Sequence, residues 1–385
     1  MATLNLRRFS NPETLKTIDR STILDFLKPH RKFFSDKSCP LPPKFSSDEI
    51  DYEAMASILI APDSTMPTEL MNALFFIHEM ATVEGMDMLL KELEEQNLQL
   101  QNSHDKQSPS DIAVQVWMDH QDILERKHAE QFMEHPRSFE YYQSDVDPLP
   151  PFKNPSEATL KAFQDEMDDW FEKKKRGRGS RVFLYPRDGD VWFLIRHGDP
   201  FRREGRMDGD EPSVLFRPEK FDVLVYDGAL GEIRVNANSK GEKELYRTKF
   251  GKHLFGDEEF FQNEGKYTLE PLRTDGADSL ECIDVEGLDS VKLREIQYLR
   301  GGAHNDIEIR KSDDMFASLK DRNQSIPPKA PILGVSFHVK FTDSKKQRTV
   351  RLRPPRNAQY GRDSDSLIIE DWLTKRGFIK NRKDS

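Results

Sequence analysis

Residues 181–196 read RVFLYPRDGDVWFLIR, with two apolar segments on either side of an Asp-Gly pair. Asp-Gly between such segments is typical of a tight β-hairpin, because glycine adopts the positive φ angles that the turn requires. We therefore predict strands over Arg181–Pro186 and Val191–Arg196, joined at Asp188 and Gly189. A hairpin at this point makes an antiparallel sheet the starting element of the fold.

The same pattern recurs downstream of this hairpin. Strands over Phe221–Tyr226 and Glu232–Asn236 are expected to pair across Asp227-Gly228. Alternating apolar residues predict more strands, over Thr268–Leu272, Val291–Leu299, Asp306–Arg310, Pro331–Phe341 and Arg348–Arg353. Helical spacing predicts helices over Gly241–His253, Asp313–Lys320 and Ser366–Arg376. Because hairpins outnumber strand-helix-strand units, we expect an α+β fold with a mixed, largely antiparallel sheet and a few helices.

Upstream of the first hairpin the apolar residues follow helical spacing. The predicted helices are Thr22–Phe34, Tyr52–Ile60, Glu69–Ala81, Glu84–Gln96, Asp111–Met118 and Gln121–Met133. Ser21 and Ser110 are the expected N-caps of the first and fifth of these. Short connections between helices with apolar stripes predict an N-terminal all-helical bundle.

A proline-rich stretch, residues 144–156 (SDVDPLPPFKNPS), separates the two patterns. Four prolines cannot continue a helix and favour an extended spacer. The charge changes nearby: the first 150 residues carry 14 Lys+Arg and 26 Asp+Glu, whereas residues 334–385 carry 13 and 6. We therefore predict an acidic helical module over 1–143, a linker over 144–156, and an α+β domain over 157–385.

Composition bounds the class of protein. The 385 residues are 36% hydrophobic and 33% charged, which suits a globular protein with a strongly ionic surface. Cys39 and Cys282 form no CxxC pair, which fits a reducing compartment. The N-terminus lacks the apolar segment of a signal peptide, and no apolar run approaches the ~18 residues that span a bilayer. A cytoplasmic location without membrane insertion is expected.

Several familiar sites have no matching motif in this sequence. The chain contains no GxxxxGK[ST] phosphate-binding loop. His120, His128 and His135 would share one helix face, but a spacing of eight residues rises by ~12 Å, too far for one metal ion. Neither cysteine has a neighbouring ligand, so we predict no metal or other cofactor from these residues.

Phe193–Asp199 reads FLIRHGD, and Arg206 and Gly209 follow it. This string resembles the histidine-phosphatase superfamily, in which Arg-His-Gly ends an apolar strand. The resemblance implies that His197 attacks phosphorus while Arg196 and Arg206 hold the phosphoryl oxygens. The second motif of that superfamily, a strand ending in His-Gly, is missing here. A histidine exposed at the end of a strand is the alternative interpretation.

Asp222 and Glu232 suggest a second hydrolase arrangement on the second hairpin. Metal-dependent nucleases of the restriction-endonuclease type place an Asp near one strand end and Glu-x-Lys on the next, where the carboxylates bind Mg²⁺. Glu232-Ile-Arg234 is similar, with Arg in the place of Lys. Arginine stays protonated and is a poor substitute for that lysine. Alternating charge on the solvent-facing side of a hairpin also explains the pattern.

Basic residues cluster on the last predicted hairpin, at Lys345, Lys346, Arg348, Arg351 and Arg353. Residues two apart on a strand share a face, so Arg351 and Arg353 point the same way. Phe337, Phe341 and Tyr360 are close enough in sequence to offer stacking surfaces for bases. Together these residues predict a surface that follows a nucleic-acid backbone.

These patterns favour a two-module binding protein over an enzyme. The acidic helical module is expected to bind a protein partner, and the basic face of the α+β domain a nucleic acid or an acidic partner. The alternative is a phosphate-ester hydrolase, acting at His197 or, with Mg²⁺, at Asp222 and Glu232. Convergence of His197, Arg196 and Arg206 in a pocket would favour that alternative.

Overall fold

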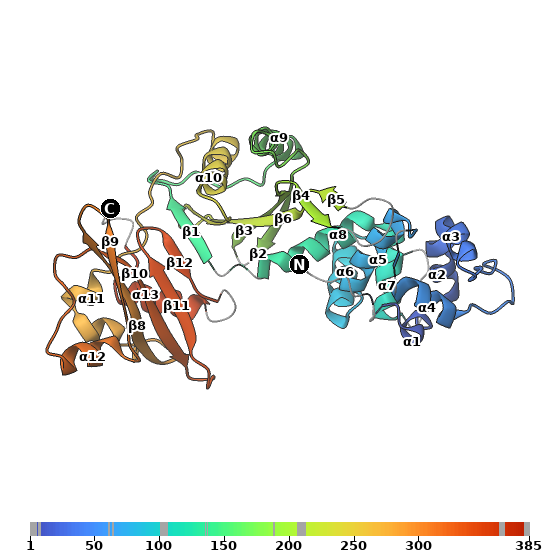
Figure 1. The fold of residues 1–385 in the computed structure, drawn as a ribbon. Coiled ribbons are helices and arrows are strands. Elements are labelled where there is room, and N and C mark those ends of the chain that lie inside the picture. Colours follow the sequence, from blue (N-terminus) through green and yellow to red (C-terminus); the bar gives the residue numbers. More distant parts are fainter. Residues whose placement is uncertain are drawn as a thin grey trace. The chain divides into compact units, whose positions relative to one another are not determined.

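The computed structural model describes residues 6, 9–60, 62–63, 65–100, 107–134, 136, 138–187, 189–205, 213–361 and 366–380 (Figure 1). The chain forms two compact units. The first consists of Met1–Phe132 with Arg203–Leu215, and the second of Met133–Arg202 with Phe216–Ser385. This arrangement confirms an α+β fold in which the N-terminal part is helical and the rest forms a large antiparallel sheet.

The first unit is a bundle of short helices. They are α1 (Pro12–Leu15), α2 (Arg20–Leu27), α3 (Arg31–Asp36), α4 (Tyr52–Ile60), α5 (Thr68–Met80), α6 (Val83–Glu95), α7 (Pro109–Asp119) and α8 (Gln121–Glu130), with 3₁₀ turns at Lys28–His30 and Gln131–Glu134. Helix α7 is buried on most sides, including its polar Ser110, Asp111 and Gln115. A two-stranded sheet of β4 (Arg202–Gly205) and β5 (Ser213–Phe216) comes from later in the chain.

Two N-caps of the bundle lie two residues earlier than predicted. Asp19 caps α2 by accepting hydrogen bonds from the backbone of Ser21 and Thr22. Ser108 caps α7 by accepting one from Asp111, and Pro109 occupies the first helical position. Both choices follow the usual preferences, since an Asp or Ser accepts from the first free N–H groups and Pro needs no hydrogen bond there.

The second unit is built on one ten-stranded antiparallel sheet. Its order is β2-β3-β6-β7-β1-β12-β11-β10-β8-β9. The strands are β1 (Ser138–Gln143), β2 (Arg181–Arg187), β3 (Asp190–Gly198), β6 (Glu219–Asp227), β7 (Glu232–Asn236), β8 (Leu288–Gly301), β9 (Asp306–Lys311), β10 (Ile332–Phe341), β11 (Arg348–Arg353) and β12 (Asn357–Gln359). The hairpins predicted for β2–β3 and β6–β7 are confirmed by their antiparallel pairing.

The boundary between the units differs from the predicted linker at 144–156. Strand β1 precedes that stretch and already belongs to the sheet, pairing with β7 and β12. The proline-rich stretch itself lies against the second unit: the Ser144 N–H donates to the Gly231 carbonyl at 2.9 Å. The Phe152 and Tyr226 rings have centroids 4.9 Å apart. Prolines favour an extended backbone, which here covers the edge of a core and does not separate two domains.

Helices cover the two halves of the sheet separately (Figure 1). Helices α9 (Glu157–Lys173) and α10 (Lys240–Phe255) pack on the β2–β7 half, with Phe163, Phe171 and Phe250 fully buried. The other half is covered by α11 (Pro271–Thr274), α12 (Met315–Asp321) and α13 (Ser366–Lys375). The Trp372 ring of α13 lies 5.2 Å from that of Phe337 on β10.

The strand predicted over Thr268–Leu272 is wrong. Residues 271–274 form helix α11, and Pro271 occupies its first turn. Proline has no N–H for a sheet ladder but fits the first turn of a helix, so the alternation of apolar residues was misleading here. Tyr267, directly before the predicted strand, forms an isolated bridge with Ile379.

Replacing Gly251 by alanine should destabilise the protein, although alanine normally favours a helix interior. A Cβ atom at this position of α10 would lie 2.5 Å from the Asp257 carbonyl oxygen and 3.3 Å from the Phe260 Cβ. The clash should outweigh the ~1 kcal/mol gain in helix propensity and leave a net loss of about 1–3 kcal/mol. Urea unfolding of the full chain measures the difference. A more stable Gly251→Ala protein would contradict this close approach.

Candidate functional site

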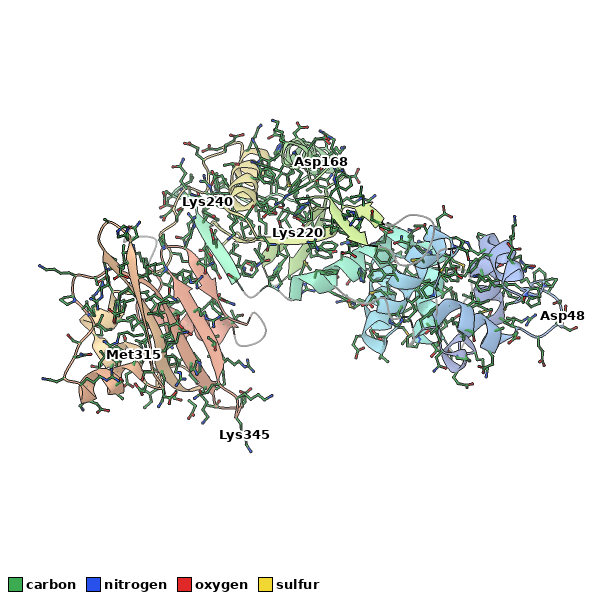
Figure 2. All side chains as sticks on the ribbon, in the orientation of Figure 1. Asp48, Asp168, Lys220, Lys240, Met315 and Lys345 are labelled. Atoms are coloured by element: carbon green, nitrogen blue, oxygen red, sulfur yellow. The ribbon has the colours of Figure 1, made fainter. Side chains whose placement is uncertain are left out.

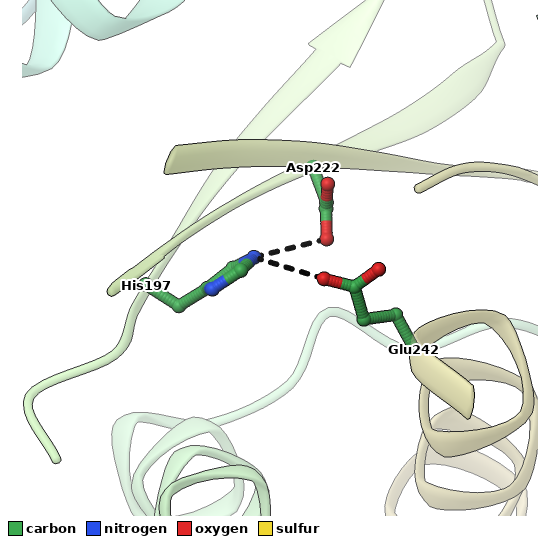
Figure 3. Close-up of side chains that lie close together, drawn as sticks. All are labelled: His197, Asp222 and Glu242. Carbon is green, nitrogen blue, oxygen red and sulfur yellow. Dashed lines mark hydrogen bonds and ion pairs between the residues drawn. The ribbon is translucent and has the colours of Figure 1, made fainter. Parts of the chain in front are cut away.

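His197 lies inside the second unit, near the end of β3. Its side chain is 1% exposed and its ring stacks on Phe171 of α9, with centroids 4.3 Å apart and an angle of 12°. Asp222 of β6 and Glu242 of α10 face the same imidazole nitrogen (Figure 3). The Nε2 atom lies 3.0 Å from Asp222 Oδ2 and 3.9 Å from Glu242 Oε1. Nδ1 lies 2.9 Å from the Gly198 carbonyl oxygen.

The strand register brings these side chains together. Ile195 pairs with Asp222 and His197 pairs with Lys220, so the histidine and the aspartate are diagonal neighbours on one face of the sheet. Glu242 is the third residue of α10, the helix that packs on this face of the sheet, and its side chain reaches the histidine from there. It belongs to a capping box, in which its carboxylate accepts a hydrogen bond from the Ser239 backbone and the Ser239 hydroxyl accepts one from the Glu242 backbone.

Both carboxylates, those of Asp222 and Glu242, already form ion pairs with cationic side chains. Lys220 Nζ lies 2.8 Å from Glu242 Oε1 and 3.3 Å from Asp222 Oδ1, and Arg176 forms an ion pair with Glu242. The Tyr246 hydroxyl donates to Asp222 Oδ2 at 2.8 Å. Burial raises the pKa of Glu242, but hydrogen bonds from Lys220 and Ser239 outweigh it and hold that pKa at about 2. Glu242 is therefore ionised at neutral pH.

We call His197, Lys220, Asp222, Glu242 and Arg176 the buried ion cluster. In the described part of the chain, His197, Asp222 and Glu242 are the group whose donor atoms lie close enough to hold a metal ion, within 4.8 Å of one another. A metal ion would have to displace both Lys220 and Arg176. Because the two carboxylates are balanced by these two cations, the arrangement fits an internal ion-pair network better than a metal centre.

The residues implied by the phosphatase resemblance do not converge in an open pocket. His197 is buried, with hydrogen-bond partners at both ring nitrogens. Arg196 is its neighbour on β3 and points to the opposite face, where its Nε lies 3.3 Å from Glu219. Arg206 lies outside the described residues. The alternative interpretation, a histidine exposed at the end of a strand, is wrong, because His197 is only 3% exposed.

Asp222 and Glu232 lie at opposite ends of the β6–β7 hairpin. Val223 pairs with Asn236 and Asp227 with Glu232, so about five residues, or ~17 Å, separate the two carboxylates along the strands. Glu232 is engaged elsewhere: Lys266 Nζ lies 2.6 Å from its Oε1, and Gln143 Nε2 donates to its Oε2 at 2.8 Å. The two predicted carboxylates therefore form no shared Mg²⁺ site.

The basic hairpin of β10 and β11 has the predicted alternation. Arg351 and Arg353 are exposed, whereas Leu352 between them and Val350 before them are fully buried. Lys345 and Lys346 are exposed in the connecting turn, and Lys345 projects from its tip (Figure 2). The Arg348 guanidinium lies 4.9 Å from the centre of the Phe341 ring. Four of the five predicted cations are thus exposed, and Arg348 is half-buried.

The aromatic residues expected to stack on bases are not available. Phe337, Phe341 and Tyr360 are each at most 1% exposed. Phe337 lies on the inner face of β10, against Trp372 and Phe378 of the helical cover. Apolar rings on a strand face the covered side of the sheet, and the basic residues alternate with them. The hairpin offers charge without a stacking platform.

Neighbouring cations on the outer side of this half-sheet are neutralised. Their ion pairs are Lys292–Asp314 at 3.5 Å, Lys311–Glu295 at 2.9 Å and Lys340–Asp289 at 2.6 Å. Arg351 and Arg353 differ from them, since neither forms an ion pair with the residues that the structure describes. Arg351 donates to the Gln359 side chain at 3.4 Å, and its charge contributes to lowering the pKa of Glu295 on the same face. The surplus positive charge is concentrated on β11 and its turn.

Sequence reasoning missed most of the buried ion cluster. It selected His197 and Asp222 for two separate hypotheses and did not connect them with Lys220, Glu242 or Arg176. One signal was present: Ser239-Lys-Gly-Glu242 is a capping-box sequence at the start of a predicted helix. That signal places Glu242 at a helix N-terminus, but it does not show which strand residues face it.

No family model matches this chain, and no curated protein matches it either. Across the residues that the structure describes, none of the helices combines the length and the apolar composition needed to cross a membrane.

Proposed function

We propose that this chain is a non-enzymatic binding protein that holds a nucleic-acid backbone on its basic hairpin. The observation that carries this proposal is the pair Arg351 and Arg353, exposed on one face of β11 and outside every ion pair described above. Lys345 and Lys346 extend the same charge into the turn. Cations outside an ion pair are available for phosphates, and each contact releases condensed counterions.

The absence of exposed rings on this hairpin narrows the expected mode of binding. Phosphate contacts fix the position of a nucleic acid without reading its sequence. We therefore expect weak dependence on sequence and strong dependence on salt. Buried Phe337 and Phe341 make base stacking an unsuitable source of affinity here.

The acidic helical unit is proposed to bind a protein partner. Its first 132 residues carry 13 basic against 22 acidic residues, a surplus of negative charge that opposes contact with nucleic acid and suits a basic protein surface. A cytoplasmic location is proposed for the whole chain, because Cys39 and Cys282 are both free and buried, as suits a reducing environment.

Replacing Arg351 and Arg353 together with glutamate should abolish nucleic-acid binding and leave the melting temperature nearly unchanged. Reversing two phosphate-binding charges removes favourable contacts and adds repulsion, whereas exposed charges contribute little to stability. Fluorescence anisotropy with labelled RNA and DNA at ~50 mM salt, where such contacts are strong, gives the measurement. The unmodified protein should bind, with affinity falling steeply as salt rises.

Lys153→Glu/Lys240→Glu is the matched control, since it reverses two exposed charges of the same unit that belong to neither strand of the hairpin. It should bind like the unmodified protein. Loss of binding in both double variants would show a general charge effect and contradict a defined face. If the unmodified protein binds polyglutamate but neither RNA nor DNA, its partner is an acidic protein and the nucleic-acid proposal fails.

A further inference from the structure

A polar hollow of about 600 Å³ lies beside the edge strand β9. Its lining includes Arg300, Glu308, Arg310, Arg322, Asn323 and Gln324. These residues come from the end of β8, from β9 and from the turn that follows α12. Three arginines against one glutamate leave the hollow with a surplus of positive charge.

The guanidinium groups of this hollow are only partly neutralised. Arg300 Nε donates to Glu308 at 2.6 Å, which balances one arginine. Arg310 Nη2 donates to the neutral Gln324 Oε1 at 3.1 Å. Within the described residues, Arg310 and Arg322 have no carboxylate partner. Two positive charges thus remain for a ligand.

A buried tyrosine, Tyr298, packs against Arg300 beside the hollow, although it is not one of the residues that line it. Tyr298 pairs with Glu308 across β8 and β9, and the Arg300 guanidinium lies 5.5 Å from its ring centre. The side chain is buried, and its hydroxyl has no hydrogen-bond partner among the described residues. Burial raises the pKa of Tyr298, so the hydroxyl keeps its proton as a donor. Such orphaned groups are rare, because leaving one unsatisfied is costly.

We propose that this hollow, which we call the arginine hollow, binds a phosphate monoester or diphosphate group. Two unneutralised guanidinium groups match the charge of about −2 on a phosphate monoester at neutral pH. The planar donors of arginine fit phosphate oxygens in pairs, which a point-charge lysine does not. The proposed ligand is therefore a phosphorylated small molecule, or the terminal phosphate of a nucleic-acid strand.

This site is distinct from the basic hairpin. Ser336 pairs with both Arg351 and Glu295, which places these residues on one face of the sheet. Arg310 pairs with Ile296, and Ile296 is fully buried on the other face. The arginine hollow and the proposed backbone-binding face thus lie on opposite sides of the same half-sheet, and each can be removed without touching the other.

Calorimetric titration with pyrophosphate tests the proposal on the full chain. The unmodified protein should bind with a Kd of about 1 mM or tighter, and Arg310→Gln/Arg322→Gln should weaken binding by about 100-fold, roughly tenfold for each lost charge-assisted contact. Lys153→Gln/Lys240→Gln removes two exposed charges outside both the hollow and the basic hairpin; it is the matched control and should bind pyrophosphate normally. Absence of pyrophosphate binding, or binding that survives loss of Arg310 and Arg322, overturns the site.

Glu308→Gln tests the charge balance of the hollow, because pyrophosphate affinity would not change if Glu308 had only a structural role. Removing this carboxylate frees Arg300 and lowers the repulsion of an anion, so pyrophosphate affinity should rise several-fold. Tyr298→Phe should leave pyrophosphate affinity unchanged, because Tyr298 does not line the hollow, and the melting temperature should stay the same or increase, because the orphaned hydroxyl is gone. If Glu308→Gln leaves pyrophosphate affinity unchanged or lowers it, the proposed charge balance is wrong.

The source of the phosphate is distinguished on the Arg351→Gln/Arg353→Gln background, where the backbone-binding face is absent. Adenosine monophosphate is compared there with one oligonucleotide that carries or lacks a 5′-phosphate. If the phosphorylated oligonucleotide binds more tightly than both its unphosphorylated form and adenosine monophosphate, the ligand is a strand end. If adenosine monophosphate and the phosphorylated oligonucleotide bind with equal affinity, the ligand is a small molecule. If neither adenosine monophosphate nor the phosphorylated strand binds, the proposal fails for phosphate monoesters even when the backbone-binding face is confirmed.

Discussion

Lys266→Met should destabilise the protein by about 3–5 kcal/mol, the range found when one partner of a buried ion pair is removed. Lys266 is 6% exposed, and its Nζ lies 2.6 Å from Glu232 Oε1 and 3.9 Å from the centre of the Tyr141 ring. Burial lowers the pKa of Lys266, but the charges of Glu232 and other nearby groups, together with the hydrogen bond to Glu232, outweigh burial and keep that pKa above its usual value. Methionine retains the apolar stem and leaves the carboxylate without its cation.

The double variant Lys266→Met/Glu232→Gln separates charge from packing. Glutamine removes the uncompensated charge and can still accept the hydrogen bond from Gln143, so the double variant should be more stable than Lys266→Met alone. Lys311→Met is the control, because Lys311 forms an ion pair while 72% exposed and should change stability little. Urea unfolding gives all three values. A double variant less stable than Lys266→Met would assign the loss to packing.

Glu242→Gln should lower stability by about 3 kcal/mol at pH 7, because a pKa held near 2 in place of 4.5 corresponds to that free energy. The carboxylate is fully buried between Lys220 and Arg176, and the amide that replaces it cannot balance both cations. Glu244→Gln on the same helix is the control. Glu244 pairs with Arg247 at a side-chain exposure of 53% and should contribute little.

The pH dependence of this difference has a definite sign. The pKa of Glu242 is depressed in the folded protein, so its stabilisation is present above the unfolded value of about 4.5 and is lost as the pH falls toward about 2. The difference between Glu242→Gln and the unmodified protein should therefore shrink steadily below about pH 4.5. Unfolding free energies measured from pH 7 to pH 3 test this, and a gap that stays constant would show that the charge of Glu242 is not its source.

The sequence predicted element types well where periodicity and turn chemistry agreed. Tyr52–Ile60 and the two Asp-Gly hairpins are examples, since each combines a clear apolar pattern with a recognisable end. It missed β1, because Ser138–Gln143 is a six-residue segment whose partners, β7 and β12, are distant in sequence. Local propensity carries no information about such pairing. Because β1 belongs to the sheet, the boundary between the units lies before β1 and not at the proline-rich stretch.

The candidate site was predictable residue by residue but not as an arrangement. Alternation placed Arg351 and Arg353 on one face, and this prediction was confirmed because it depends on a single strand. The environment of His197 depends instead on the register of β3 with β6 and on the packing of α10 above them. Neither can be read from the motif around the histidine, so a resemblance of a few residues suggested an exposed nucleophile where the fold buries an ion pair.

The position of β1 in the middle of the sheet has a consequence for how the protein is made. During translation β1 emerges before every other strand of the ten, and its neighbour β7 follows about a hundred residues later. Its other neighbour, β12, is the last of the ten strands along the chain. One edge of β1 therefore stays open on the ribosome until residues 357–359 have been synthesised, and an open edge is a template for wrong pairing. We expect the nascent chain to depend on chaperones during this interval more than its finished stability would suggest.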